Sequence, residues 1–75
     1  MIEVKVTTPE GRTTYHAEED NSIMEFFQSQ TIELHGATVS LDGITLTHAE
    51  LNKSFTENYV DELCRLTVTV KSDNG

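Results

Sequence analysis

The sequence is poor in cysteine, proline, tryptophan and basic residues. Its 75 residues include one cysteine, one proline, no tryptophan and five Lys and Arg side chains. A single cysteine, Cys64, cannot form an internal disulfide, which suits a reducing compartment. No apolar run approaches the ~20 residues of a membrane span, and Met1-Ile2 is followed at once by Glu3, which argues against a signal peptide. The sequence therefore predicts a cytoplasmic protein.

The shortage of basic residues narrows the choice of partners. The 13 acidic side chains outnumber the 5 basic ones, for a net charge of -8. Nucleic-acid binding needs Lys and Arg to displace counterions from phosphates, and anionic membrane surfaces attract the same side chains. We therefore expect neither a nucleic-acid nor a membrane partner. The charge is compatible with a basic protein partner, and it also serves solubility alone.

Residue patterns typical of catalysis or metal binding are also missing. The histidines His16, His35 and His48 lack the close spacing of zinc ligands, and the sequence has no Gly-rich phosphate loop. Cys64 falls on the expected buried face of a strand, where burial disfavours the reactive thiolate. A domain of this size also has little room for a substrate cleft of ~300 Å³ or more. The sequence predicts a non-enzymatic protein with no metal and no cofactor.

The first part of the chain predicts a hairpin followed by a helix. Apolar and polar residues alternate over residues 2–7 and 12–17, and Pro9-Glu10-Gly11 between them favours a reversal. Ser22 and Glu25 have the spacing of a capping box at a helix start. Apolar residues then follow at helical spacing, which predicts a helix of two to three turns with a buried stripe: Ile23, Phe26 and Phe27.

The middle of the chain contains one ambiguous segment and a second hairpin. In Thr31–His35, Ile32 and Leu34 fit either a continued helix or a short strand. Asp42-Gly43 separates two alternating apolar runs, Val39 with Leu41 and Ile44 with Leu46, which is a strong hairpin signal.

The residues after this hairpin predict a short helical turn over residues 48–53. Thr47 and Glu50 repeat the capping-box spacing. We expect the turn to bury Leu51, and Phe55 to anchor the loop that follows.

A final strand is predicted from about Glu62 to Lys71. Its apolar residues alternate with polar ones, so we expect one buried face formed by Cys64, Leu66, Val68 and Val70. The opposite face would carry Arg65, Thr67 and Thr69. The chain then ends in Ser72-Asp73-Asn74-Gly75.

This order of strand, strand, helix, Asp42-Gly43 hairpin, helical turn and strand resembles the β-grasp fold, and more narrowly the ubiquitin-like proteins. The resemblance covers nearly the whole length and implies a single α+β domain, residues 1–75. It implies a mixed sheet of four to five strands with one main helix packed on one face. In that fold the first and last strands lie parallel in the middle of the sheet.

The resemblance suggests two functions. One is non-covalent binding of a protein partner, as an interaction module or accessory subunit. Ubiquitin binds partners through an apolar patch, but the matching positions here, Thr67 and Thr69, are polar. A surface on this face would instead combine Lys5, Arg65, Thr67 and Thr69. We expect such a module to be a monomer.

The other function is that of a sulfur carrier or protein modifier acting through the Gly75 carboxylate. Its chemistry needs a slender Gly-Gly tail, whereas Asp73 and Asn74 precede Gly75 here. A third hypothesis is an acidic inhibitor that mimics nucleic acid. That hypothesis requires acids ordered along one face, whereas the acidic residues are scattered along the sequence.

Overall fold

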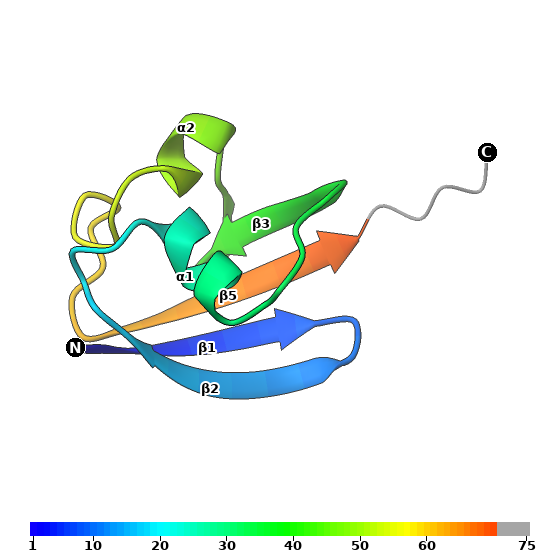
Figure 1. Cartoon of the computed structure of the whole chain (residues 1–75), viewed down its shortest axis with the longest axis horizontal. Coiled ribbons are helices and arrows are strands. Elements are labelled where there is room, and N and C mark those ends of the chain that lie inside the picture. The colour runs from blue at the N-terminus through cyan, green and yellow to red at the C-terminus, as the bar shows by residue number, and fades with distance from the viewer. Residues whose placement is uncertain (71–75) are drawn as a thin grey trace.

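The structure of the chain, a computed structural model, describes residues 1–70. These residues form a five-stranded sheet with two helices (Figure 1). The elements in chain order are β1 Ile2–Thr8, β2 Gly11–Ala17, α1 Ile23–Ser29, β3 Ala37–Leu41, β4 Ile44–Thr45, α2 His48–Leu51 and β5 Leu63–Val70.

The sheet is mixed, and its strand order is β2-β1-β5-β3-β4. Strands β1 and β5 pair in parallel at its centre, with Val4 opposite Cys64 and Lys5 opposite Arg65. The neighbouring pairs β1–β2, β3–β5 and β3–β4 are antiparallel. Helix α1 packs across one face (Figure 1). The expected α+β β-grasp arrangement is therefore confirmed, with the five-strand version of the sheet.

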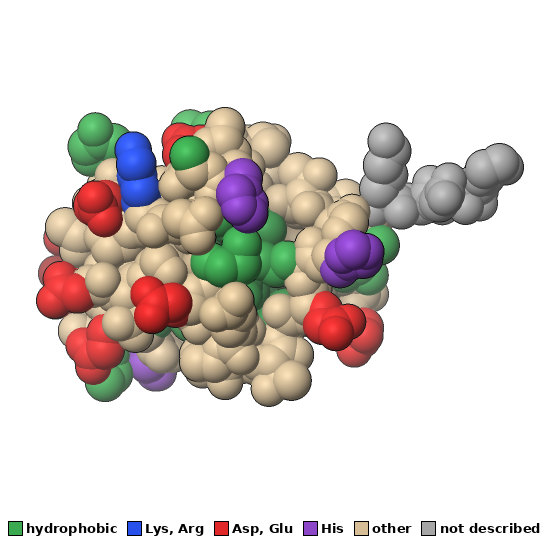
Figure 2. All heavy atoms as spheres, turned by 45° about the horizontal axis from the view of Figure 1, so that its top comes forward, with side chains coloured by type: hydrophobic (Ala, Val, Ile, Leu, Met, Phe, Trp, Pro, Cys, Tyr) green, Lys and Arg blue, Asp and Glu red, His purple; other side chains and the backbone are tan. Residues whose placement is uncertain are grey.

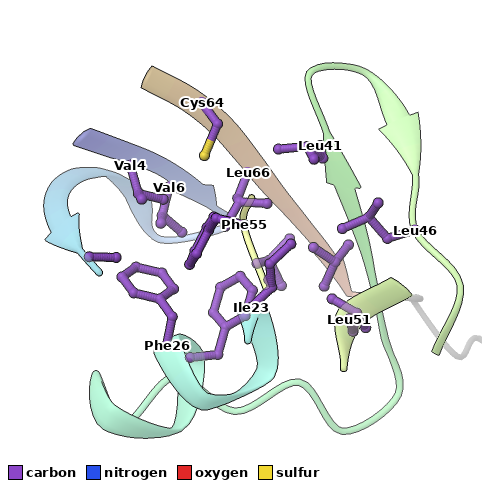
Figure 3. Packing of buried hydrophobic residues seen from close by; sticks show 14 of the residues in the cluster. Val4, Val6, Ile23, Phe26, Leu41, Leu46, Leu51, Phe55, Cys64 and Leu66 are labelled. Atoms are coloured by element: carbon purple, nitrogen blue, oxygen red, sulfur yellow. The ribbon is translucent and has the colours of Figure 1, made fainter. Parts of the chain in front are cut away.

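One hydrophobic cluster fills the space between the sheet and α1 (Figure 3). The predicted apolar faces of β1 and β5 contribute to it, and Cys64 turns its sulfur toward it. Phe55 is fully buried, and its ring meets that of Phe26 edge to face at 5.7 Å between centroids. Leu51 is also buried, as expected. The loop after α2 is thus anchored to the core by an aromatic contact.

Reciprocal Ser or Thr and Glu hydrogen bonds begin both helices, as the sequence predicts. The Glu25 N–H donates to Ser22 Oγ at 3.0 Å, and the Ser22 N–H donates back to Glu25 Oε1 at 3.4 Å. Thr47 and Glu50 form the same pair of bonds at the start of α2. Helix α2 ends at Leu51, two residues before the expected end at Lys53.

The segment Thr31–His35 is neither helix nor strand, so both expectations for it are wrong. Thr31 has φ of 59° and stops α1. Its N–H donates to the Gln28 carbonyl, and the Ile32 N–H donates to the Phe27 carbonyl at 2.9 Å. This is the Schellman motif, which usually places glycine where Thr31 stands. The helix end was not predictable because the sequence lacks that glycine.

Two positions on apolar faces are exposed, contrary to the pattern. Val70 is 55% exposed and Ile44 is 70% exposed. Helix α1 has 7 residues and is about 10 Å long, whereas the 8 residues of β5 extend about 26 Å. The helix is therefore too short to cover the whole strand, and Val70 is the last residue of β5. Ile44 lies on the two-residue edge strand β4. Lys71, expected in the same strand as Val70, lies outside the described residues.

The left-handed backbone of Thr31 predicts that glycine at this position stabilises the protein. Replacing Thr31 with glycine should raise the free energy of unfolding by about 0.5–1 kcal/mol, because glycine adopts the left-handed conformation without steric cost. Chemical denaturation followed by circular dichroism measures the change. Thr38→Gly, in the extended strand β3, is the matched control and should destabilise the protein. A loss of stability in Thr31→Gly would contradict this account of the helix end.

Candidate interaction site on the open sheet face

The face of the sheet opposite α1 carries the four residues named from the sequence. Lys5 and Arg65 are direct partners in the β1–β5 register, and Thr7 pairs with Thr67 two residues further along both strands. Thr69 lies two residues beyond Thr67 and pairs with Thr38 of β3. All four predicted residues are exposed. We call this set, Lys5, Arg65, Thr67 and Thr69, the basic strip.

The register extends the basic strip to both sides with residues that sequence reasoning missed. Thr67 pairs with Ser40, which pairs with Thr45, so hydroxyl side chains continue across β3 and β4. On the other side, Thr7 pairs with Arg12 of β2. Arg12 therefore adds a third basic side chain at the edge of this face. The position of Arg12 on this face follows from the register of the β1–β2 hairpin, which the sequence alone does not give.

The cations of this face are not neutralised by ion pairs among residues 1–70. The one ion pair in that range joins the amino-terminal NH₃⁺ to Glu19 at 3.8 Å. Lys5 and Arg65 instead face each other as like charges across a strand pair, an arrangement that costs stability. Three of the five basic residues thus share one face of a protein with net charge -8.

Acidic side chains are prominent on the helix side, where Figure 2 shows many Asp and Glu and few Lys or Arg. On the sheet side, Asp42 fixes the backbone of Arg65. The Arg65 N–H donates to Asp42 Oδ1 at 3.0 Å, and the Asp42 N–H donates to the Arg65 carbonyl at 2.9 Å. Asp42 and Gly43 both have positive φ, as expected for this hairpin turn. The turn therefore ties the β3–β4 hairpin to the strand that carries Arg65.

Cys64 is a buried thiol on the opposite face of β5. Its side chain is 1% exposed. Burial raises the pKa of the Cys64 thiol from its ordinary value of 9.0 to about 12, and the nearby Asp42 carboxylate also raises it. The thiol thus remains protonated at neutral pH, and a nucleophilic role is disfavoured.

This raised pKa predicts a loss of stability at alkaline pH. Between about pH 9 and 12 the unfolded chain releases the Cys64 proton while the folded chain keeps it. Because the folded state then binds more protons, the free energy of unfolding falls as pH rises through this range. Cys64→Ala lacks the thiol, so its free energy of unfolding should fall less steeply as pH rises. Urea unfolding of both proteins at pH 8, 9.5 and 10.5 tests the difference. If the free energy of unfolding fell equally with pH in both proteins, the raised pKa of Cys64 would be contradicted.

A hollow of about 890 Å³ is lined by residues of β1, β2, β5 and the segment after α1, so the expectation that the domain has little room for a cleft of ~300 Å³ is wrong. Its apolar lining includes Val6, Tyr15, Ile32, Val68 and Val70. Glu10 of the β1–β2 turn, Arg12 at the start of β2 and Glu33 after α1 also line it. The described residues contain no group of three His, Cys, Asp or Glu that could hold a metal ion. Within residues 1–70 no helix is long and apolar enough to span a membrane. Gly75, the expected carrier carboxylate, lies outside the described residues.

Comparison with known proteins identifies the fold. The chain is similar to the solution structure of the ubiquitin-like domain of an Arabidopsis thaliana protein, with a TM-score of 0.76 and 19% identity over 99% of this chain and 81% of that one. A ubiquitin-like protein from Trypanosoma brucei matches with a TM-score of 0.75 and 16% identity over 95% of both chains. A computationally designed protein based on human erythrocytic ubiquitin gives a TM-score of 0.67 and 16% identity over 100% of this chain and 98% of that one.

No family model and no curated protein matches the sequence itself. The chain is therefore a small domain with the ubiquitin-like β-grasp fold, and the likeness lies in the backbone arrangement.

Proposed function

We propose that this protein is a non-enzymatic protein-interaction module, or an accessory subunit, that binds a partner through the basic strip. The observation that carries the proposal is the grouping of Lys5, Arg65 and Arg12 on one face, where none of the three forms an ion pair with another described residue. Repulsion between like charges on paired strands lowers the stability of the fold. An acidic partner surface that binds these three cations offsets this cost, which explains why they are grouped.

The neighbouring hydroxyls suit the same role. Thr67, Thr69 and Ser40 can both donate and accept hydrogen bonds, and β-branched threonine loses little rotamer freedom on binding because its side chain is already restricted. The binding surface is therefore polar, with electrostatic complementarity setting association rate and specificity. The four residues of the basic strip supply its centre, and Arg12 supplies its β2 edge.

The grouping of bases does not favour an acidic mimic of nucleic acid, because such a mimic needs its acids on a continuous face. Nor does any described residue favour the carrier function, which depends on Gly75. A protein partner with an acidic patch accounts best for the open face.

Site-specific photo-crosslinking tests the proposed surface. Benzoylphenylalanine replaces Thr67 in one protein and the exposed Gln28 of α1 in a matched control. After irradiation in an extract of the source cells, we expect a discrete adduct at position 67 alone. Lys5→Glu and Arg65→Glu together should abolish that adduct, because they replace attraction by repulsion. An adduct that survives this charge reversal, or that forms equally at position 28, would sink the proposal.

The charge variants also separate binding from folding. Lys5→Gln or Arg65→Gln should leave the free energy of unfolding within about 0.5 kcal/mol of its starting value, since both side chains are exposed. Urea denaturation measures this. A large destabilisation would instead assign these cations a structural role.

A further inference from the structure

A groove separate from the open sheet face lies between the β3–β4 hairpin and the loop after α2. Its volume is about 300 Å³. The buried side chains Leu41 and Leu46 contribute to it, and the exposed side chains Ile44 and Tyr59 also line it. Glu50, Glu57 and Lys53 provide the charged groups of its rim. The groove thus combines apolar surface with two carboxylates and one ammonium.

Tyr59 is unusual in both its backbone and its exposure. Its φ is 64°, in the left-handed region that bulky residues rarely adopt. Its side chain is 96% exposed, and its hydroxyl makes no hydrogen bond to the described residues. Folding gains little from a tyrosine in this position, and asparagine or glycine would fit the backbone better. Such strain at an exposed aromatic residue points to a role in binding.

Ile44 presents a second apolar surface to the same groove. It is 70% exposed on β4, directly after the Asp42-Gly43 turn. Tyr59 and Ile44 are thus two of the large exposed hydrophobic side chains of residues 1–70, and both line this one groove. A partner side chain inserted there would remove apolar surface of both residues from water.

The two carboxylates are held in place by hydrogen bonds that the fold already uses. Glu50 Oε1 accepts from the Thr47 N–H at 2.8 Å. Glu57 Oε1 accepts from the Ser54 N–H at 3.0 Å, while the Glu57 N–H donates to Ser54 Oγ at 3.0 Å. The second oxygen of each carboxylate accepts no hydrogen bond from the described residues.

Both groups are ionised at neutral pH. Hydrogen bonds from the Thr47 backbone and side chain lower the pKa of Glu50, and those from Ser54 lower the pKa of Glu57. The positive charge of Lys53 acts on both in the same direction. Two negative charges against one positive charge leave the rim with a net negative charge that favours a basic ligand.

We propose that this groove docks a segment of a partner protein in which an aliphatic or aromatic side chain stands next to a lysine or arginine. The apolar side chain packs between Ile44 and Tyr59. The neighbouring cation meets the free oxygens of Glu50 and Glu57. The groove is a second surface of opposite charge preference to the basic strip, so it does not depend on the function proposed above.

Two matched sets of blocked heptapeptides test the proposal. Each peptide has a central Leu, Phe or Trp, flanked by Lys or Arg in the basic set and by Glu in the acidic set. Titration into isotope-labelled protein should shift the amide resonances of Ile44, Glu50 and Tyr59 saturably with the basic set alone. Tyr59→Asn and Ile44→Thr should weaken this binding about tenfold or more, since each removes a contact worth a buried apolar side chain.

Three controls make the result decisive. Leu63→Thr alters an exposed apolar residue outside the groove and should retain binding. Tyr59→Asn should melt at or above the temperature of the unmodified protein, so its loss of binding is not unfolding. Lys5→Gln with Arg65→Gln should bind the peptides normally, which separates the groove from the basic strip.

Several outcomes would overturn the proposal. They are no saturable binding, equal binding of the acidic set, and full binding by Tyr59→Asn. Groove resonances that move with protein concentration in the absence of peptide would assign the surface to a second copy of the chain instead.

Discussion

The parallel pairing of β1 with β5 is the constraint on which the rest of this structure depends. Strands from opposite ends of the described chain lie side by side in the middle of the sheet, so β2 pairs with one of them and β3 with the other. Their inward residues, among them Val4, Leu66 and Cys64, form the base of the core. Their outward residues form the basic strip. One strand pair therefore sets both the packing that stabilises the protein and the surface that we propose binds a partner.

Much of this fold was predictable from local patterns, because its elements follow their intrinsic preferences. Alternation marked β1 and β5, and Ser22 and Thr47 marked both helix starts. The errors arose where tertiary geometry decides. Thr31 accepts a left-handed backbone without being glycine, and the short α1 leaves Val70 uncovered. A third pair with the same spacing, Ser54 and Glu57, forms the same reciprocal hydrogen bonds in the loop after α2, so this local signal is also present in the sequence.

The candidate surfaces were less predictable than the fold because they combine distant residues. The sequence places Lys5 and Arg65 on outward faces, but only the strand order makes them neighbours. Arg12 joins them through the register of the first hairpin. The groove at Tyr59 had no comparable sequence pattern, since its apolar and acidic residues come from a hairpin, a helix and a loop. Spatial convergence of this kind is a property of topology, which composition and periodicity do not encode.

The central position of β5 also constrains how the chain folds. β5 follows the other four strands in the described chain, yet it pairs with both β1 and β3. Without β5, the hydrogen-bonding edges that β1 and β3 present to it are left unpaired. Contacts between the two ends carry a high loop-closure cost, so they form slowly compared with local turns. The core therefore closes only when β5 joins the sheet, and a chain that lacks β5 retains exposed strand edges prone to aggregation.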